Sequence, residues 1–327
     1  MSALSATLLF VGGLVLTIAA SLVLARSLDR VGVRLGISEA LLGIVTAIGA
    51  DAPEISSAVV AIVAGHADTG VGVVIGSNVF NIAALLGLSA VVAGSVRIHK
   101  HGLILNAGVA VAVAVAGALL ALGWIPAGVA FALTILVLAP YVVLSSLRSD
   151  TLRRLPLGVR RALAEEQSDA RRDEHVAPAT RVDAVLLVPS LAAVVGGATA
   201  MVYAAQSLGD RWHLSDVVIG TIVLAALTGI PNVLAAIRLA LHGRGAACVS
   251  ESLNSNNANI LIGLCVPALI LGIGSASGIE RFAAAAMVGM TLLASALAYR
   301  GGALTRSDGL LVIACYAVFV AVVVSAA

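Results

Sequence analysis

The segment GSNVFN at residues 76–81 returns 178 positions further along the chain as NSNNAN at residues 254–259. At this offset, nine of the 34 positions from residue 53 onward carry the same residue. The matched pairs are Pro53 with Pro231, Ala58 with Ala236, Gly65 with Gly243, Val71 with Val249, Ser77 with Ser255, Asn78 with Asn256, Asn81 with Asn259, Ile82 with Ile260, and Leu86 with Leu264. Since the polar matches cannot follow from composition in so apolar a chain, we infer an internal repeat.

The composition places this repeat in a membrane. The 327 residues are 60% hydrophobic and 11% charged, with a mean hydropathy of +1.09, which lies outside the range of soluble globular chains. Several uncharged stretches exceed the roughly 18 to 20 residues that span a bilayer. Apolar segments lie at about 4–25, 39–64, 70–93, 102–123, 126–147, 183–207, 215–241, 247–272, 282–299 and 309–326. The sequence therefore predicts an all-α integral membrane protein with ten transmembrane helices, and its net charge of +2 gives no indication of a nucleic-acid partner.

The positive charges predict the orientation of the chain. Ten helices place both termini on one side of the membrane. Of the 19 lysines and arginines, 17 fall in the odd-numbered loops, and only Arg211 and Arg281 fall in the even-numbered ones. Because positive loops are retained in the cytoplasm, we expect a multi-pass protein of the inner or plasma membrane with both termini extracytoplasmic.

A charged stretch divides the chain into two equal parts. Residues 148–181 hold eight arginines and six acidic residues, and we interpret them as a cytoplasmic linker. A first five-helix repeat at 1–147 precedes the linker, and a second at 182–327 follows it. Because equivalent helices are then separated by an odd number of crossings, the two repeats are inverted. Inverted repeats with interrupted helices are typical of secondary transporters that bind their substrate near the middle of the membrane.

Only three carboxylates fall well inside apolar segments: Asp51, Glu54 and Glu251. Each costs about 2.5 kcal/mol or more at the centre of a bilayer, so an acidic residue there indicates a functional site. Pro53 lies between the first two and removes a backbone donor, which breaks a helix and frees a carbonyl one turn earlier.

Amides and hydroxyls lie near these acids on the same predicted helices. Ser77 and Asn81 are four residues apart and share one face, and Glu251, Ser255 and Asn259 form one stripe with the same spacing. Such hard oxygens suit Na⁺, Ca²⁺ or H⁺ and not a soft metal. The alternative is that the serines and asparagines only bridge neighbouring helices.

Two motifs carry a family resemblance. GADAPE at residues 49–54 resembles the G-T-S-x-P-E signature of the sodium/calcium exchanger, or cation/calcium antiporter, superfamily, and residues 76–81 resemble its G-S-N-I-F-N. TGIPN at residues 228–232 and NSNNAN at 254–259 are similar in weaker form. The resemblance implies a cation antiporter whose site lies between the second, third, seventh and eighth helices. The ligands that it implies are the side chains of Glu54, Ser77, Asn81, Thr228 and Ser255, with the backbone around Ala50 and Thr228.

The chain departs from the family pattern at three positions. The second-repeat glutamate is Asn232, a second-repeat serine is Gly229, and a first-repeat serine is Asp51. A symmetric calcium site with two glutamates is therefore not expected, and Asp51 or Glu251 would have to restore the number of acids. A single carboxylate would suit a monovalent cation or a proton better than Ca²⁺. Asp51, Asn232, Glu251 and Asn259 therefore join the predicted cation ligands.

We expect a secondary active antiporter that exchanges Ca²⁺, or a related cation, for Na⁺ or H⁺ by alternating access. A monovalent cation/proton antiporter, a cation channel and a non-transporting ion-binding membrane protein remain alternatives. An intramembrane protease would need a serine with a lysine or histidine at depth, or paired aspartates on two helices, and the sequence offers neither arrangement. No enzymatic activity and no cofactor besides the transported cations is expected, and the oligomeric state stays open.

The arginine distribution predicts the result of a labelling experiment. A tag at either terminus should be accessible from outside the cell, whereas a cysteine placed near Ser168 should react only from the cytoplasmic side. Labelling of the N-terminus from the cytoplasm would contradict the helix assignment.

Overall fold

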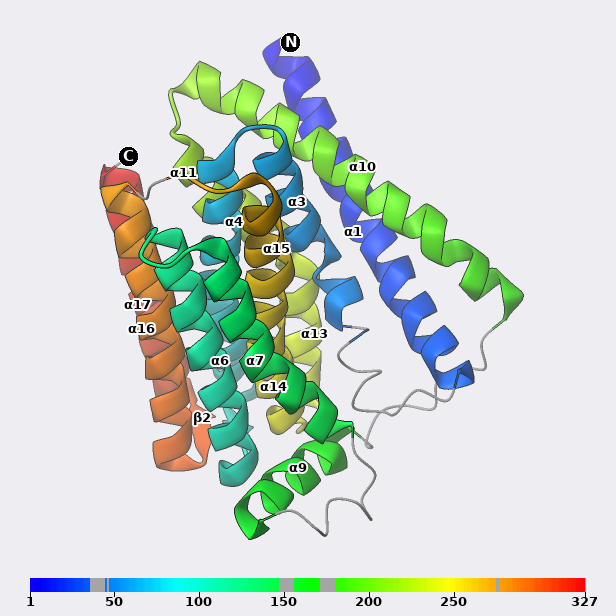
Figure 1. Ribbon diagram of the computed structural model, residues 1–327, viewed down its shortest axis with the longest axis vertical. Helices are drawn as coiled ribbons and strands as arrows, with labels where there is room; N and C mark the ends of the chain where they lie inside the picture. The colour runs from blue at the N-terminus through cyan, green and yellow to red at the C-terminus, as the bar shows by residue number, and fades with distance from the viewer. Residues whose placement is uncertain (36–44, 46, 147–155, 171–179, 275–276, 327) are drawn as a thin grey trace.

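The structure is a computed structural model that describes residues 1–35, 45, 47–146, 156–170, 180–274 and 277–326 (Figure 1). The described residues are almost entirely helical. The first half contains α1 (Ala3–Arg34), α3 (Ala52–Val63), α4 (Ala67–Asn81), the π-helical segment η1 (Ile82–Leu88), α5 (Ser89–Ala93), α6 (Lys100–Ala121) and α7 (Ala127–Ser145). Helix α9 (Leu157–Ala170) lies within the predicted linker.

The second half repeats this order. It contains α10 (Arg181–Trp212), α11 (Asp216–Val218), η2 (Ile219–Leu224), α12 (Ala225–Thr228), α13 (Ile230–Leu241), α14 (Gly245–Ala258), η3 (Asn259–Cys265), α15 (Val266–Leu271), α16 (Gly278–Gly301) and α17 (Arg306–Ala326). One departure from the all-α expectation is a two-stranded antiparallel ribbon in which β1 (Ser95–Arg97) pairs with β2 (Ala303–Thr305). It joins the two halves at one end of the helices.

The described residues contain fewer membrane-length helices than the ten that the sequence predicts. Among the described residues, eight continuous helical runs are long and apolar enough to cross a membrane. A ninth is formed if Asp216–Thr228 and Ile230–Leu241, which meet at a bend of 47°, count as one span. The predicted segment 39–64 is represented here by α3, of 12 residues, because most of its earlier part lies outside the described residues. The chain is thus a multi-pass membrane protein, and the count of ten is not confirmed.

The backbone reproduces the repeat that the sequence indicates. Helices α1 and α10 both have 32 residues and begin 178 positions apart, and α3 and α13 both have 12 residues at the same offset. The continuous runs Ala67–Ala93 and Gly245–Leu271 match in the same way. Each run is followed by a glycine in the left-handed region, Gly94 at φ 85° and Gly272 at φ 75°, a conformation that side chains disfavour.

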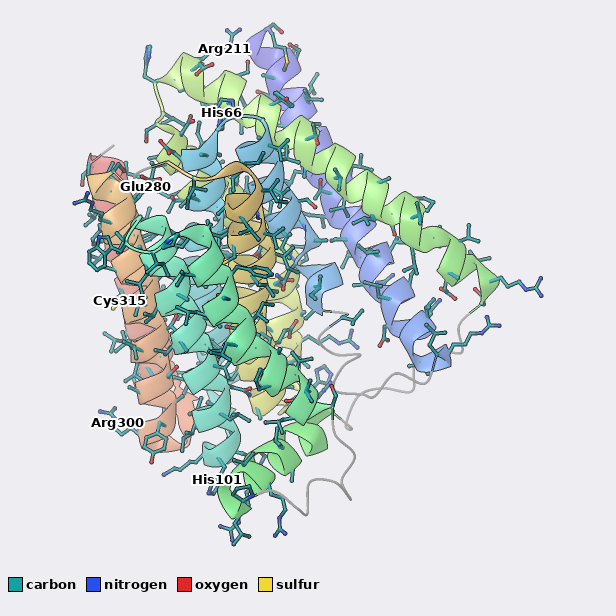
Figure 2. The ribbon with its side chains drawn as sticks, viewed as in Figure 1. His66, His101, Arg211, Glu280, Arg300 and Cys315 are labelled. Carbon is teal, nitrogen blue, oxygen red and sulfur yellow. The ribbon has the colours of Figure 1, made fainter. Side chains whose placement is uncertain are left out.

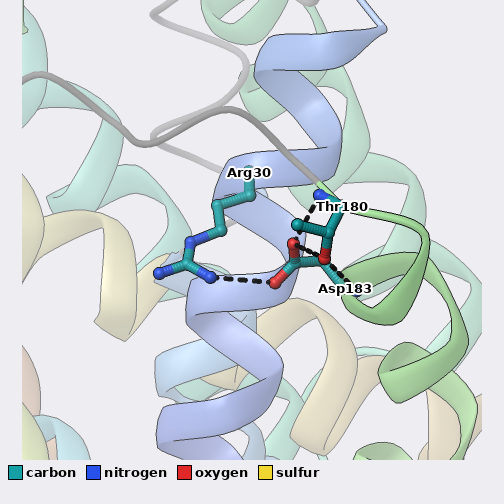
Figure 3. Close-up of polar contacts among 3 residues, drawn as sticks. All are labelled: Arg30, Thr180 and Asp183. Carbon is teal, nitrogen blue, oxygen red and sulfur yellow. Dashed lines mark hydrogen bonds and ion pairs between the residues drawn. The ribbon is translucent and has the colours of Figure 1, made fainter.

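Equivalent helices run in opposite directions where α1 meets α10. Arg30, in the last turn of α1, pairs with Asp183, in the first turn of α10, at 3.0 Å (Figure 3). At the other end, the Arg211 guanidinium donates a hydrogen bond to the Met1 carbonyl. The two helices therefore lie side by side and antiparallel (Figure 1), as an inverted repeat requires.

The Arg30 contact depends on a helix cap. Thr180 precedes α10 and forms a capping box with Asp183, which accepts hydrogen bonds of 2.7 Å from the Thr180 backbone nitrogen and hydroxyl. The cap fixes the carboxylate of Asp183, so that its other oxygen faces Arg30.

Apolar side chains cover the outside of the molecule. Leu4 of α1, Leu136 of α7, Val188 of α10 and Val318 of α17 are each more than 60% exposed, whereas the α4 run is almost completely buried. So much exposed apolar surface on a soluble chain would indicate association with other molecules. Here it is the surface that contacts lipid, and α4 lies in the protein interior.

The two termini lie at the same end of the molecule (Figure 1). Arg211 and His66 lie at that end, whereas Arg300 and His101 lie at the opposite one, as does α9 (Figures 1 and 2). This arrangement agrees with an even number of crossings. The side of the membrane that each end faces stays a prediction.

Because α4 and η2 pack closely, a single methyl group added between them should destabilise the fold. A Cβ at Gly220 would collide with the backbone of Thr69, whereas a Cβ at Gly108 of α6 meets nothing within 4 Å. We expect Gly220→Ala to lower the free energy of unfolding by about 1–3 kcal/mol. Gly108→Ala should be neutral or stabilising by up to about 1 kcal/mol. Thermal unfolding of the detergent-purified variants measures both, and equal midpoints would contradict the close approach.

Candidate cation site

Two broken helices position the polar residues. Asp51 precedes α3 with φ −78° and ψ −5°, and Gly229, 178 positions later, precedes α13 with φ −77° and ψ −8°. Each is followed two residues later by a proline, which has no N–H and leaves a carbonyl of the preceding turn without its helical donor. The two breaks place Glu54 and Asn232 in the first turns of their helices, at equivalent positions.

The carboxylates of Asp51 and Glu54 are buried and lie in one hydrogen-bond network. They are 2% and 1% exposed. Oδ1 of Asp51 accepts hydrogen bonds from Nδ2 of Asn232 and from the Ser255 hydroxyl, both at 2.7 Å. Oε1 of Glu54 accepts from the same Asn232 nitrogen at 3.2 Å, and its Oε2 accepts from Nδ2 of Asn259 at 2.5 Å. Residues from both halves of the chain thus meet around two acids.

A symmetric set of asparagines joins α4 to α14 beside these acids. Nδ2 of Asn78 donates to the Asn256 carbonyl at 3.3 Å, and Nδ2 of Asn256 donates to the Asn78 carbonyl at 3.1 Å. Likewise Asn81 donates to Oδ1 of Asn256 at 3.1 Å, and Asn259 donates to Oδ1 of Asn78 at 3.5 Å. Because these contacts exchange under the offset of 178, a pseudo-twofold axis passes between the two helices.

Asn78 and Asn256 were not among the predicted ligands. The structure assigns their amide groups to contacts between the two halves. Their identity at the repeat offset was the signal in the sequence, because a residue that contacts its own equivalent must satisfy the same geometry from both sides.

Several oxygens in and beside this network have no hydrogen-bond partner. They are Oδ2 of Asp51, Oγ of Ser77, and Oδ1 of Asn81, Asn232 and Asn259, all of them buried. A buried polar atom without a partner ordinarily costs about 1–3 kcal/mol. Four of these oxygens belong to the network, and Ser77 lies one turn before Asn81 on α4. Oxygens of this kind suit a hard cation, since Ca²⁺ takes six to eight oxygen ligands from carboxylates, amides, carbonyls and water.

The remaining predicted ligands have distinct surroundings. Thr228 is fully buried, and its hydroxyl donates to the Leu224 carbonyl at 2.8 Å, which leaves the oxygen lone pairs available. Ala50 lies in the helical turn just before Asp51. Glu251 lies one turn before Ser255 on α14 and is partly exposed, unlike the buried acids.

The donor atoms are mainly neutral. No group of three histidine, cysteine or acidic side chains that could hold a metal ion occurs among the described residues. The network therefore combines two carboxylates with amide and hydroxyl oxygens, a set that suits alkali and alkaline-earth cations.

The chain is similar to known exchangers along most of its length. The family model described as "Sodium/calcium exchanger protein" matches residues 5–149 and 182–325. The inner membrane protein YrbG of Escherichia coli is 31% identical over 125 residues, which are 38% of each chain. Sodium/potassium/calcium exchanger 1 of Homo sapiens is 36% identical over 73 residues, which are 22% of this chain and 7% of that protein. The chain thus matches less than two fifths of the length of these curated relatives.

A solved structure shares the fold. It is the sodium-calcium exchanger NCX_Mj soaked with 2.5 mM Na⁺ and 10 mM Sr²⁺, which aligns with a TM-score of 0.63 at 24% identity over 98% of this chain and 99% of that one. The same exchanger soaked with 10 mM Na⁺ and 10 mM Sr²⁺ aligns with a TM-score of 0.62 at 25% identity over 97% of each chain.

The reciprocal asparagine contacts predict equal effects of equivalent substitutions. Asn78→Ala and Asn256→Ala should each lower the free energy of unfolding by about 1–3 kcal/mol, because each removes a buried side-chain hydrogen bond to a carbonyl of the other half and a buried amide acceptor. Thr7→Ala, which removes an exposed hydroxyl bonded only to its own helix, is the control and should have little effect. Thermal unfolding in detergent measures all three. Destabilisation by only one asparagine substitution would contradict the twofold contact.

Proposed function

The chain belongs to the sodium/calcium exchanger protein family, and from this premise we propose that it is a secondary active antiporter that exchanges Ca²⁺ or a related cation for Na⁺ or H⁺. The family is one of transporters, so the function lies in moving cations across the bilayer and not in catalysis. Small inorganic cations are the substrates.

The pair of buried carboxylates carries this proposal. Asp51 and Glu54 share one amide donor, and in the described part of the chain neither forms an ion pair with a basic side chain. Two buried negative charges without a basic partner are costly in a membrane interior. A bound cation offsets this cost and also satisfies the oxygens that have no hydrogen-bond partner.

The location of the network supports alternating access. Ser77 and Asn81 lie near the middle of the run Ala67–Ala93, and Ser255 and Asn259 lie near the middle of Gly245–Leu271. A site at mid-depth between inverted halves is equally distant from both membrane surfaces, so related movements of the two halves can open it to either side in turn.

We assign the parts of the chain accordingly. Residues 1–147 and 182–327 form the two five-helix repeats, residues 148–181 form a cytoplasmic linker, and both termini are extracytoplasmic. The ligands that we assign lie on α3, α4, α12, α13, α14 and η3, and in the turn that precedes α3. Those ligands are Asp51, Glu54, Ser77, Asn81, Thr228, Asn232, Ser255 and Asn259, with the backbone at Ala50. Glu251, one turn before Ser255, is a further candidate ligand.

Flux measurements test the mechanism. Purified protein in liposomes is supplied with Ca²⁺ while a Na⁺, K⁺ or pH gradient is imposed in turn. An exchanger takes up Ca²⁺ only when an opposing cation gradient is present, and the gradient that drives uptake identifies the counter-ion. Uptake without any opposing gradient would indicate a channel, and Na⁺ or H⁺ flux without Ca²⁺ flux would indicate a monovalent cation/proton antiporter.

Glu54→Gln is the decisive substitution for the site. It preserves the shape of the side chain but removes a charge that offsets dehydration of the cation, so we expect the cation flux to fall by at least about tenfold while folding is retained. Asp68→Asn, which neutralises an exposed acid in the first turn of α4, is the matched control and should transport normally. Wild-type flux in Glu54→Gln would remove Glu54 from the site.

A further inference from the structure

The two acids of the network both come from the first half of the chain. At the offset of 178, Asp51 corresponds to Gly229 and Glu54 corresponds to Asn232. The backbone at these positions and the asparagine contacts between α4 and α14 obey the twofold relation. The two halves therefore share the twofold relation in backbone conformation and asparagine contacts, but they differ in the number of acidic side chains that they contribute.

Asp51 forms its side-chain hydrogen bonds across the pseudo-twofold axis, with residues of the second half. Its Oδ1 accepts hydrogen bonds from two residues of the second half, Asn232 and Ser255. Asp51 thus extends toward the position equivalent to Glu54, where the second half has a neutral amide. The second negative charge lies beside position 232 although it is carried by residue 51.

The amide of Asn232 has a fixed orientation. Its Nδ2 lies 2.7 Å from Oδ1 of Asp51 and 3.2 Å from Oε1 of Glu54. Ionised carboxylates only accept hydrogen bonds, so the nitrogen must face them, and Oδ1 of Asn232 is left without a partner. A third acid at position 232 would place its oxygens against both carboxylates, which like charges disfavour. Acidic side chains at positions 51 and 232 therefore exclude each other.

We propose that Asp51 and Asn232 are a charge-exchanged pair, in which Asp51 supplies the second carboxylate of the cation site from the first half and makes the site selective for divalent cations. This inference rests on the proposed cation site. Two carboxylates match the charge of a divalent ion, whereas Glu54 alone would match a monovalent one.

Reversing the pair tests the proposal. The variants are Asp51→Asn, Asn232→Asp and the double substitution, made in the full-length protein, with Asp68→Asn as the control. Ca²⁺ and Na⁺ binding are measured by calorimetry and by the rise in unfolding temperature with each ion, because a ligand that binds only the folded state stabilises it. These measurements report binding and do not require transport.

Each variant has a distinct expected result. Asp51→Asn should weaken Ca²⁺ binding by at least about tenfold and Na⁺ binding by less, because one of two charges is lost. Asn232→Asp should also weaken Ca²⁺ binding, through repulsion and loss of the shared donor. The double substitution should recover Ca²⁺ affinity to within a few-fold of wild type. It again places two carboxylates in the site and one amide donor at the contact between residues 51 and 232, which measures 2.7 Å in the wild type.

Several outcomes would overturn the proposal that Asp51 and Asn232 form a charge-exchanged pair. Wild-type Ca²⁺ binding in Asp51→Asn, or no recovery in the double variant, would show that residue 51 does not supply the second charge. If Asp51→Asn does not fold, the comparison of Asn232→Asp with the double variant decides the same question. A wild-type protein that binds no Ca²⁺ removes both the pair and the proposed site, whereas one that binds Ca²⁺ without exchange removes only the antiporter mechanism.

Discussion

The negative charge of Asp51 and Glu54 is the constraint on which the rest of the site depends. Two carboxylates that are almost completely buried need hydrogen-bond donors from the protein. The donors come from α13, α14 and η3, which belong to the other half of the chain. The breaks at Pro53 and Pro231, the reciprocal asparagines and the close packing of α4 against η2 all serve to bring these helices together.

Symmetry and function make different demands on this structure. The helix lengths, the dihedral angles of Asp51 and Gly229 and the paired contacts of Asn78 and Asn256 show that two similar halves pack around a common axis. Packing depends on the backbone and on neutral amides, which tolerate exact duplication. Charge is not duplicated in this chain, because Asp51 and Glu54 already place two carboxylates beside position 232, where a third would repel both.

The motifs GADAPE and GSNVFN and their repeats allowed the broken helix, the internal repeat and most residues of the network, though not the contacts of Asn78 and Asn256, to be predicted from the sequence, because proline and intramembrane acids have few structural uses. The number of helices could not be settled in the same way. The π-helical segments η1, η2 and η3 were not predicted, since apolar periodicity does not distinguish a π-helix from an α-helix over one or two turns. The direction in which Asp51 points was open as well, because the Asn232 and Ser255 groups that hold it lie about 180 to 200 residues away in the sequence.

Asparagine is suited to this site because one side chain meets two opposite requirements. Asn81, Asn232 and Asn259 each donate through Nδ2 to an oxygen of the network, and each keeps an Oδ1 without a hydrogen-bond partner. The nitrogen stabilises the acids while the oxygen is available to a cation. An aspartate at position 232 or 259 would repel the carboxylate that it contacts, and an alanine there would remove one of the donors of that carboxylate. The residues that hold the acids in the fold are therefore the same ones whose oxygens suit a cation, so ion binding and the stability of the site depend on one set of side chains.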